Sequence, residues 1–248
     1  MRRSLLRAAL GICVFITGLT FAQAQEEVDK MLENLRWLGH SGFRLDGSKT
    51  IYFDPWKLPK NSKKADLIFI SQEHFDHFSQ DDISAISSSE TVIICDKSVS
   101  KQLQGKINFR EVKGLNPGET VELAQVKIQA VASYNIGKEF HTPDSRKLGF
   151  IVTIDGITLY HAGDTDNIPQ MKDYRCDIAL LPVSGTYVMT AEEAAEAALA
   201  IKPKIAVPMH YGDIVGSLAD AQRFKELLKG KIEVKILKQE GKNNESYS

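Results

Sequence analysis

The sequence predicts an α/β sandwich made of two similar halves within one domain. Strand hairpins are followed by βα units, and the same order then occurs again. No segment rich in proline, glycine or serine divides the chain, and its 248 residues suit one large domain. With 43% hydrophobic and 25% charged residues, the composition is typical of a globular protein with a buried core.

The first half follows a polar segment, residues 25–34, which we expect to be a short lead-in. An Asp46-Gly47 turn suits a hairpin, and the apolar run at 65–71 is typical of a strand covered on both faces. Strands are expected at residues 35–39, 42–46, 50–55, 65–71 and 90–95. Helices are expected at 80–89 and 98–106, and a loop at 109–120.

The second half opens with residues 121–133, where apolar and polar residues alternate as in one half-buried antiparallel strand. A helix should begin at Thr190, whose hydroxyl can cap it while Glu193 reaches back. An amphipathic helix is expected over residues 218–230. Further strands are expected at residues 147–155, 157–161, 176–183, 205–212 and 232–238.

Residues 1–24 have the pattern of a secretory signal peptide. Three arginines, at positions 2, 3 and 7, precede an apolar run, and Ala-Gln-Ala at 22–24 supplies small residues for cleavage. We therefore expect a mature domain over residues 25–248, with no membrane span, exported to the periplasm or secreted. The alternative is an uncleaved anchor, which the run disfavours because it is shorter than the about 20 residues of a span.

The charge balance disfavours a nucleic-acid partner. The chain has 31 basic and 32 acidic residues, and removal of the three N-terminal arginines would make it more acidic. Such a surface does not attract a phosphate backbone over long range. We expect a small-molecule substrate and no nucleic acid, and the sequence does not predict an oligomeric state.

The segment "SQEHFDHFS", residues 71–79, indicates a metal site. His74, Asp76 and His77 directly follow an apolar strand, and imidazole and carboxylate groups are ligands for Zn²⁺, Fe and Mn²⁺. Asp164 in "YHAGDTD" and His210 in "PMHYG" also follow apolar strands. Ligands from several strand ends would meet at one edge of a sandwich, so these residues together predict a metal centre.

The ordered set "GHSGF", "IYFDPW", "SQEHFDHFS", "LYHAGDTD", "LLPVSGTYVMTAEEAAEA" and "VPMHYG" resembles the metallo-β-lactamase-fold hydrolases over about residues 35–237. It is most similar to the branch that includes ascorbate-6-phosphate lactonase and many metal-dependent hydrolases. The resemblance implies a four-layer αββα sandwich. It also implies an enzyme that uses a metal-activated water on a small ester, lactone or phosphoester.

The resemblance further implies how the ligands divide between one or two divalent ions, with zinc or manganese expected. His74 and His141 would bind a first ion, Asp164 would bridge, and the second ion would be bound by Asp76, His77 and His210. Asp76 would also orient the attacking water.

His40 and His161 resemble residues that lie beside the site, and with Asp76 they are the candidates for catalysis. Either histidine could assist the leaving group. The alternative for both is to orient metal ligands through hydrogen bonds.

Gln72 departs from the family motif His-x-His-x-Asp-His, because this chain has glutamine at its first position. A neutral amide oxygen is a weaker ligand for Zn²⁺ than imidazole, so Gln72 is expected to be a weak or absent ligand. Two further functions stay open: a phosphodiesterase of the nuclease or phospholipase kind, and a non-catalytic metal-binding protein with a degraded site.

Overall fold

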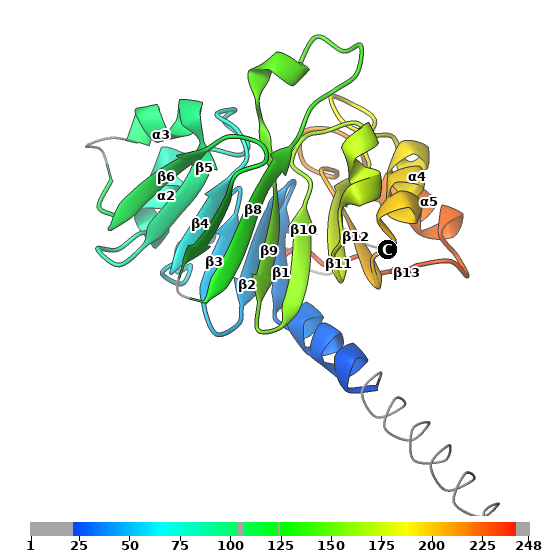
Figure 1. Cartoon of the computed structure of the whole chain (residues 1–248), viewed down its shortest axis with the longest axis horizontal. Coiled ribbons are helices and arrows are strands. Elements are labelled where there is room, and N and C mark those ends of the chain that lie inside the picture. Colours follow the sequence, from blue (N-terminus) through cyan, green and yellow to red (C-terminus); the bar gives the residue numbers. More distant parts are fainter. Residues whose placement is uncertain (1–21, 104–106, 124, 242–248) are drawn as a thin grey trace, which may run out of the picture.

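Two mixed β-sheets pack face to face at the centre of the protein (Figure 1). The computed structural model describes residues 22–103, 107–123 and 125–241. The first sheet has the order β1(Leu35–Gly39), β2(Gly42–Asp46), β3(Thr50–Phe53), β4(Leu67–Ile70), β5(Val92–Asp96), β6(Glu111–Leu115). The second has the order β13(Glu233–Val234), β12(Ile205–Met209), β11(Ile178–Pro182), β10(Ile157–His161), β9(Leu148–Ile154), β8(Val126–Ala132), β7(Thr120–Leu123).

Helices cover the outer face of each sheet. The helices are α2(Gln80–Ile86), α3(Lys97–Leu103), α4(Ala191–Ile201) and α5(Leu218–Leu227), with short 3₁₀ turns at Pro143–Ser145 and Pro169–Asp173. The first pair contacts the first sheet, and α4 and α5 contact β11 and β12 of the second. The two pairs lie at opposite sides of the molecule (Figure 1). The predicted four-layer αββα sandwich is therefore confirmed.

Each sheet combines an antiparallel part with a parallel part. Strands β1 to β3 are antiparallel and β3 to β6 are parallel, while β7 to β10 are antiparallel and β10 to β13 are parallel. Every residue of β4, β5, β11 and β12 is buried, as their continuous apolar sequences predict. The carboxyl ends of these parallel strands lie at one edge of the sandwich, where the polar motifs follow them.

The main hydrophobic core lies between the sheets, where Phe53 and Phe69 stack with ring centroids 4.9 Å apart. A second cluster lies between the first sheet and its helices, with Ile83 and Val99 fully buried against Ile93. Removal of one such side chain to alanine typically costs about 2–5 kcal/mol. Both faces of the first sheet are thus held rigidly behind the motif that follows β4.

The structure corrects four of the predicted segments. Residues 22–33 are helical, and the supposed lead-in contributes Val28 and Met31 to the core. Residues 121–133 form two strands, β7 and β8, because Gln125 takes a left-handed backbone (φ 68°) and turns the chain. The expected loop at 109–120 contains strand β6, and the expected strand at 232–238 is reduced to β13. Alternation alone did not reveal the turn.

The C-terminal segment returns to the free edge of the first sheet. Gln239 forms an isolated parallel bridge with Trp37 of β1, and the Glu240 amide donates to the Trp37 carbonyl at 2.8 Å. Arg44 on β2 donates to both carboxylate oxygens of Glu240 and to Asp46. These bonds therefore hold the chain that leaves the second sheet against the first sheet, and we call the contacts of Arg44 with Glu240 and Asp46 the clasp.

The predicted signal peptide lies almost wholly outside the described residues, which begin at residue 22. Within the described part of the chain, no helix is both long and apolar enough to cross a membrane.

Candidate metal centre

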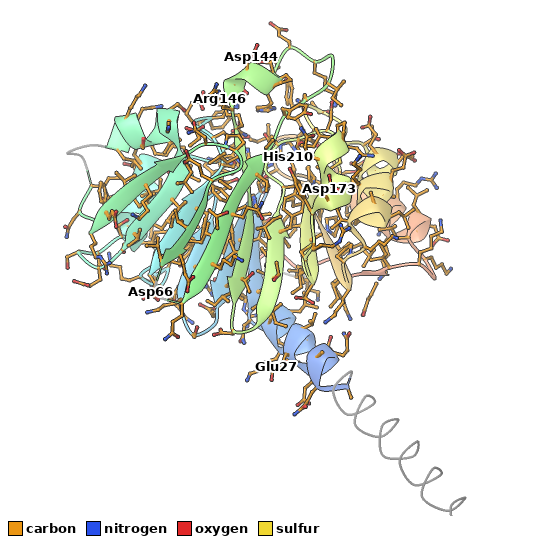
Figure 2. The ribbon with its side chains drawn as sticks, viewed as in Figure 1. Glu27, Asp66, Asp144, Arg146, Asp173 and His210 are labelled. Carbon is orange, nitrogen blue, oxygen red and sulfur yellow. The ribbon has the colours of Figure 1, made fainter. Side chains whose placement is uncertain are left out.

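The polar motifs gather at one edge of the sandwich. His77 follows β4, Asp164 follows β10 and His210 follows β12, so the two sheets contribute together. Figure 2 shows His210 at the upper end of the strands, beneath the loop that carries Asp144 and Arg146. The chain must leave each strand sharply here, and His210 does so with a left-handed backbone (φ 60°).

His77 is held by a buried carboxylate. Its Nδ1–H donates to Asp54 Oδ2 at 2.7 Å, and Asp54 also accepts from the amide and the hydroxyl of Ser71, each at 2.7 Å. In the neutral ring, this bond keeps the proton on Nδ1, so the Nε2 lone pair of His77 is directed toward the other motifs and is available to a metal ion.

Asp164 lies between two of these imidazoles. Its Oδ2 is 3.1 Å from His77 Nε2 and its Oδ1 is 3.4 Å from His210 Nε2. Burial raises the pKa of Asp164, but His210 and His77 outweigh this effect and hold the pKa well below its usual value. Burial lowers the pKa of His77, whereas Asp164 and Asp54 outweigh that and raise it. The group is a tightly coupled cluster of charge.

Asp76 lies at the edge of this cluster, with His40 behind it. His40 Nε2–H donates to Asp76 Oδ2 at 3.0 Å, and the His40 ring lies 4.0 Å from the His210 ring. Burial raises the pKa of Asp76, but the bond from His40 and the charge of His77 lower it to about 2. Asp76 is therefore a carboxylate at neutral pH.

His74 and His141 form a separate pair. His74 Nδ1 is 3.1 Å from His141 Nε2, which is 3.6 Å from Asp164 Oδ2. Burial lowers the pKa of His141, despite the opposing effect of Asp164, so its imidazole is neutral at pH 7. Asp164 thus lies between the His74–His141 pair and the His77–His210 pair.

These donor atoms fit a divalent transition metal. Two ligand atoms at about 2.1 Å from one tetrahedral ion lie about 3.4 Å apart, close to the spacings around Asp164. Ligand atoms of His40, Asp76, His77 and His210 all lie within 4.8 Å of one another. Among the described residues, His77 Nε2 and Asp164 Oδ1 are buried without a hydrogen-bond partner, as expected of atoms whose partner is a metal ion.

Comparison with known proteins decides the family. A model described as the beta-lactamase superfamily domain matches residues 34–210. This chain is a member of the metallo-β-lactamase superfamily. A UPF0173 metal-dependent hydrolase of Pyrococcus abyssi is 34% identical over 218 residues, covering 82% of this chain and 96% of that protein. One from Thermoplasma acidophilum is 36% identical over 215 residues, covering 79% and 92%.

A solved structure agrees with this assignment. A protein of Parabacteroides distasonis, placed among the metal-dependent hydrolases by its name, has a TM-score of 0.73 and 36% sequence identity. The match covers 82% of this chain and 93% of that protein. The chain is accordingly a metal-dependent hydrolase of the superfamily, as the sequence motifs predict.

The prediction that the protein is exported to the periplasm or secreted is wrong. Metal-dependent hydrolases from two Pyrococcus species and from Thermoplasma acidophilum are archaeal and align over 79–82% of this chain, and they lend no support to a secreted or periplasmic protein. The pattern of arginines and apolar residues before position 25 was the sole basis for predicting export.

Gln72 is buried beside the Asp164 carboxylate. Its Nε2–H donates to Asp164 Oδ2 at 2.8 Å, while its Oε1 is buried without a hydrogen-bond partner. An amide nitrogen has no lone pair for a metal, so in this arrangement Gln72 orients Asp164.

His161, in contrast, lies outside the cavity. It is fully buried, with Nε2 2.8 Å from the Ser41 carbonyl, Nδ1 accepting from the Gly163 amide, and its ring stacked on Phe53. Two roles were considered for His161: assistance to the leaving group and orientation of metal ligands. Its place away from the cavity lining gives no support to the first, whereas its bond from Gly163 lies in the turn that carries Asp164, as the second would require.

Several residues of the site lie outside the metal-ligand motifs and were not predicted from the sequence. Asp54 orients His77, and Ser184 Oγ lies 3.0 Å from His210 Nδ1. Left-handed backbones occur at His40, Asp54, His141, Tyr187 and His210. Such strain often occurs at functional sites. Asp54 stands near the end of the expected strand at 50–55 and within the segment "IYFDPW", and these are the signals that could have identified it.

Proposed function

We propose that the protein hydrolyses a small-molecule ester, lactone or phosphoester at a centre of one or two divalent ions, zinc or manganese. The observation that carries this proposal is the buried His77–Asp164–His210 cluster, of which Asp164 and His210 line a cavity of about 390 Å³. A cavity of that size suits a small molecule. The nearly balanced charge of the chain gives no support for a nucleic-acid substrate.

His77, His210, Asp76 and Asp164 would hold the principal ion, and His74 and His141 would contribute to a second. A bound divalent ion supplies Lewis acidity and lowers the pKa of water toward neutrality. Asp76 is ionised and faces the cavity, so it accepts a hydrogen bond from the attacking water and orients it. His40 keeps Asp76 in position through its hydrogen bond.

The bond from Gln72 to Asp164 supports one tightly bound ion. No imidazole stands at position 72 to complete a shell with His74 and His141, and the Gln72 side chain instead donates to Asp164 Oδ2, which lies 3.6 Å from His141 and 3.1 Å from His77. We expect wild-type protein to retain about one equivalent of zinc after dialysis and Gln72→His to retain about two, measured by elemental analysis. Gln129→His, exposed on β8, is the control and should match wild type.

Hydrolysis is tested with metal-replete protein on matched panels of carboxylic esters, lactones and phosphodiesters. We expect turnover that disappears on chelation and returns with Zn²⁺ or Mn²⁺. Tight binding of metal with no turnover on any panel would instead support the non-catalytic metal-binding protein. Salt-sensitive cleavage of single-stranded RNA would support the nuclease alternative.

A further inference from the structure

Exposed apolar side chains surround the mouth of the cavity above the metal centre. Four of them line it: Phe75, Phe140, Tyr187 and Ile214. We call these four residues the apolar collar. Among the described residues, the other large exposed hydrophobic side chains are Ile136, in the same loop as Phe140, and Leu199 on α4. Exposed apolar area is therefore concentrated at this one opening, and such concentration marks a binding surface.

The collar is built from separate loops and is tied to the metal centre. Phe75 lies within the histidine motif and packs edge-on against Trp56 at 6.0 Å, and Trp56 lies 5.8 Å from His40. On another side, Phe140 packs edge-on against Tyr187 at 5.1 Å. Aromatic pairs of this kind provide rigid apolar contact area.

The lining of the cavity is poor in positive charge. Its residues are His40, His74, Phe75, Asp76, Phe140, His141, Asp164, Tyr187, His210, Ile214 and Val215, without a lysine or arginine. Two nearby cations are engaged elsewhere: Lys57 lies over the Trp56 ring at 3.9 Å, and Lys138 is paired with Asp166. Phosphate groups are usually recognised by arginine or lysine, so the lining favours an uncharged ligand.

We infer that the collar binds the apolar acyl or aromatic part of a neutral carboxylic ester or lactone, whose carbonyl reaches the His/Asp cluster. This inference rests on the proposed function and selects one substrate class within it. Water adds across the acyl carbon–oxygen bond, giving a carboxylic acid and an alcohol, or a hydroxy acid from a lactone. The reaction therefore needs no other reactant.

Binding is tested separately from turnover with linear methyl ketones from 2-butanone to 2-decanone, which carry a neutral carbonyl and are not hydrolysed. Calorimetry on the metal-replete protein should show affinity rising about two- to fourfold for each added methylene, since each CH₂ leaves water for the collar. The substitutions Phe75→Ser and Ile214→Ser should each lower the affinity for 2-decanone at least tenfold. Leu199→Ser removes an equally exposed apolar side chain elsewhere (Leu199 is 38% exposed, Ile214 43%) and should bind as wild type does.

Turnover provides the second readout, through the ratio of kcat/KM for octanoyl and acetyl esters of one alcohol. We expect this ratio to exceed ten in wild type and in Leu199→Ser, and to fall several-fold in Phe75→Ser. Thermal unfolding by circular dichroism checks that each variant is folded.

The outcomes separate the collar from the proposed function. Ketone affinity that depends on chain length and on Phe75 supports the collar even if no ester is hydrolysed, in which case the proposed function alone fails. Hydrolysis without chain-length dependence overturns the collar and leaves the proposed function. A wild-type dimer that becomes monomeric in Phe75→Ser also overturns it, since the collar would then be a subunit interface.

Discussion

Asp54 is the residue on which the orientation of His77 depends. In Asp54→Asn, the amide oxygen can still accept from Ser71, but the amide NH₂ now faces His77 Nδ1 and favours the tautomer with its proton on Nε2. That proton occupies the position needed by a metal ion. We expect zinc affinity to fall about 10- to 100-fold, the usual effect of losing such a partner, measured by competition with a chromophoric chelator.

The matched control is Asp66→Asn. Asp66 also accepts a backbone amide bond beside β3 and β4, from Thr50 at 2.8 Å, but it lies at the opposite end of the strands from His210 (Figure 2). The zinc affinity of the Asp66→Asn protein should match that of wild type. Equal losses in the two variants would indicate a general effect on the sheet and contradict the assigned role of Asp54.

At the residue scale, the sequence predicted most of the polar cluster and few of its supports. Residues His74 to His77 stand together in one motif, and the strand ends pointed to Asp164 and His210. Asp54 was missed because its role depends on a contact between two strand ends. The collar was missed because its side chains come from loops whose convergence the sequence does not encode locally.

At the scale of elements, the turn that carries Asp164 depends on Gly163. This residue has φ 64°, and an added Cβ would lie 2.6 Å from the Leu148 carbonyl and 3.0 Å from Ser133 Oγ. Gly163→Ala combines backbone strain with a steric clash, so we expect it to destabilise the protein by about 1–3 kcal/mol and to weaken zinc binding by displacing Asp164. Urea unfolding and metal titration check the two effects.

Gly156→Ala is the control for this prediction. Gly156 also has a positive φ, of 80°, in the turn between β9 and β10, but an added Cβ meets nothing within 4 Å. It should cost about 1–2 kcal/mol from strain alone and leave zinc affinity unchanged. Equal loss of metal in both variants would show that Gly163 has no specific effect on Asp164.

Elements with an unambiguous pattern were predicted well from sequence. The continuous apolar runs of β4, β5 and β11 and the capping box of Thr190 and Glu193 are all observed. Predictions were wrong where tertiary contacts decide. Strand β6 is polar and partly buried, and becomes a strand because it pairs with β5. The helix at 22–33 was missed because two buried side chains are a weak signal.

At the scale of the whole molecule, the metal centre requires both sheets. Asp54 and His77 belong to the first sheet, and Asp164 and His210 belong to the second, so their approach depends on closure of the sandwich. A ligand that binds the folded state alone stabilises it. The core between the sheets and the centre at their edge therefore support each other.

The clasp between Arg44 and the C-terminal segment closes the sandwich at its other edge. Arg44→Met would leave Asp46 and Glu240 without their main partner, and we expect a loss of about 1.5–3 kcal/mol in the free energy of unfolding at pH 7.

This stabilisation depends on pH. Burial raises the pKa of Asp46, but Arg44 and Lys63 outweigh this effect and lower the pKa. The stabilisation is thus present above the unfolded value of about 3.9 and is lost as pH falls further. Urea unfolding should show the difference between wild type and Arg44→Met narrowing below about pH 4. Lys63→Met removes an exposed partner of Asp46 and should cost under about 1 kcal/mol. A difference that does not change with pH would contradict the clasp.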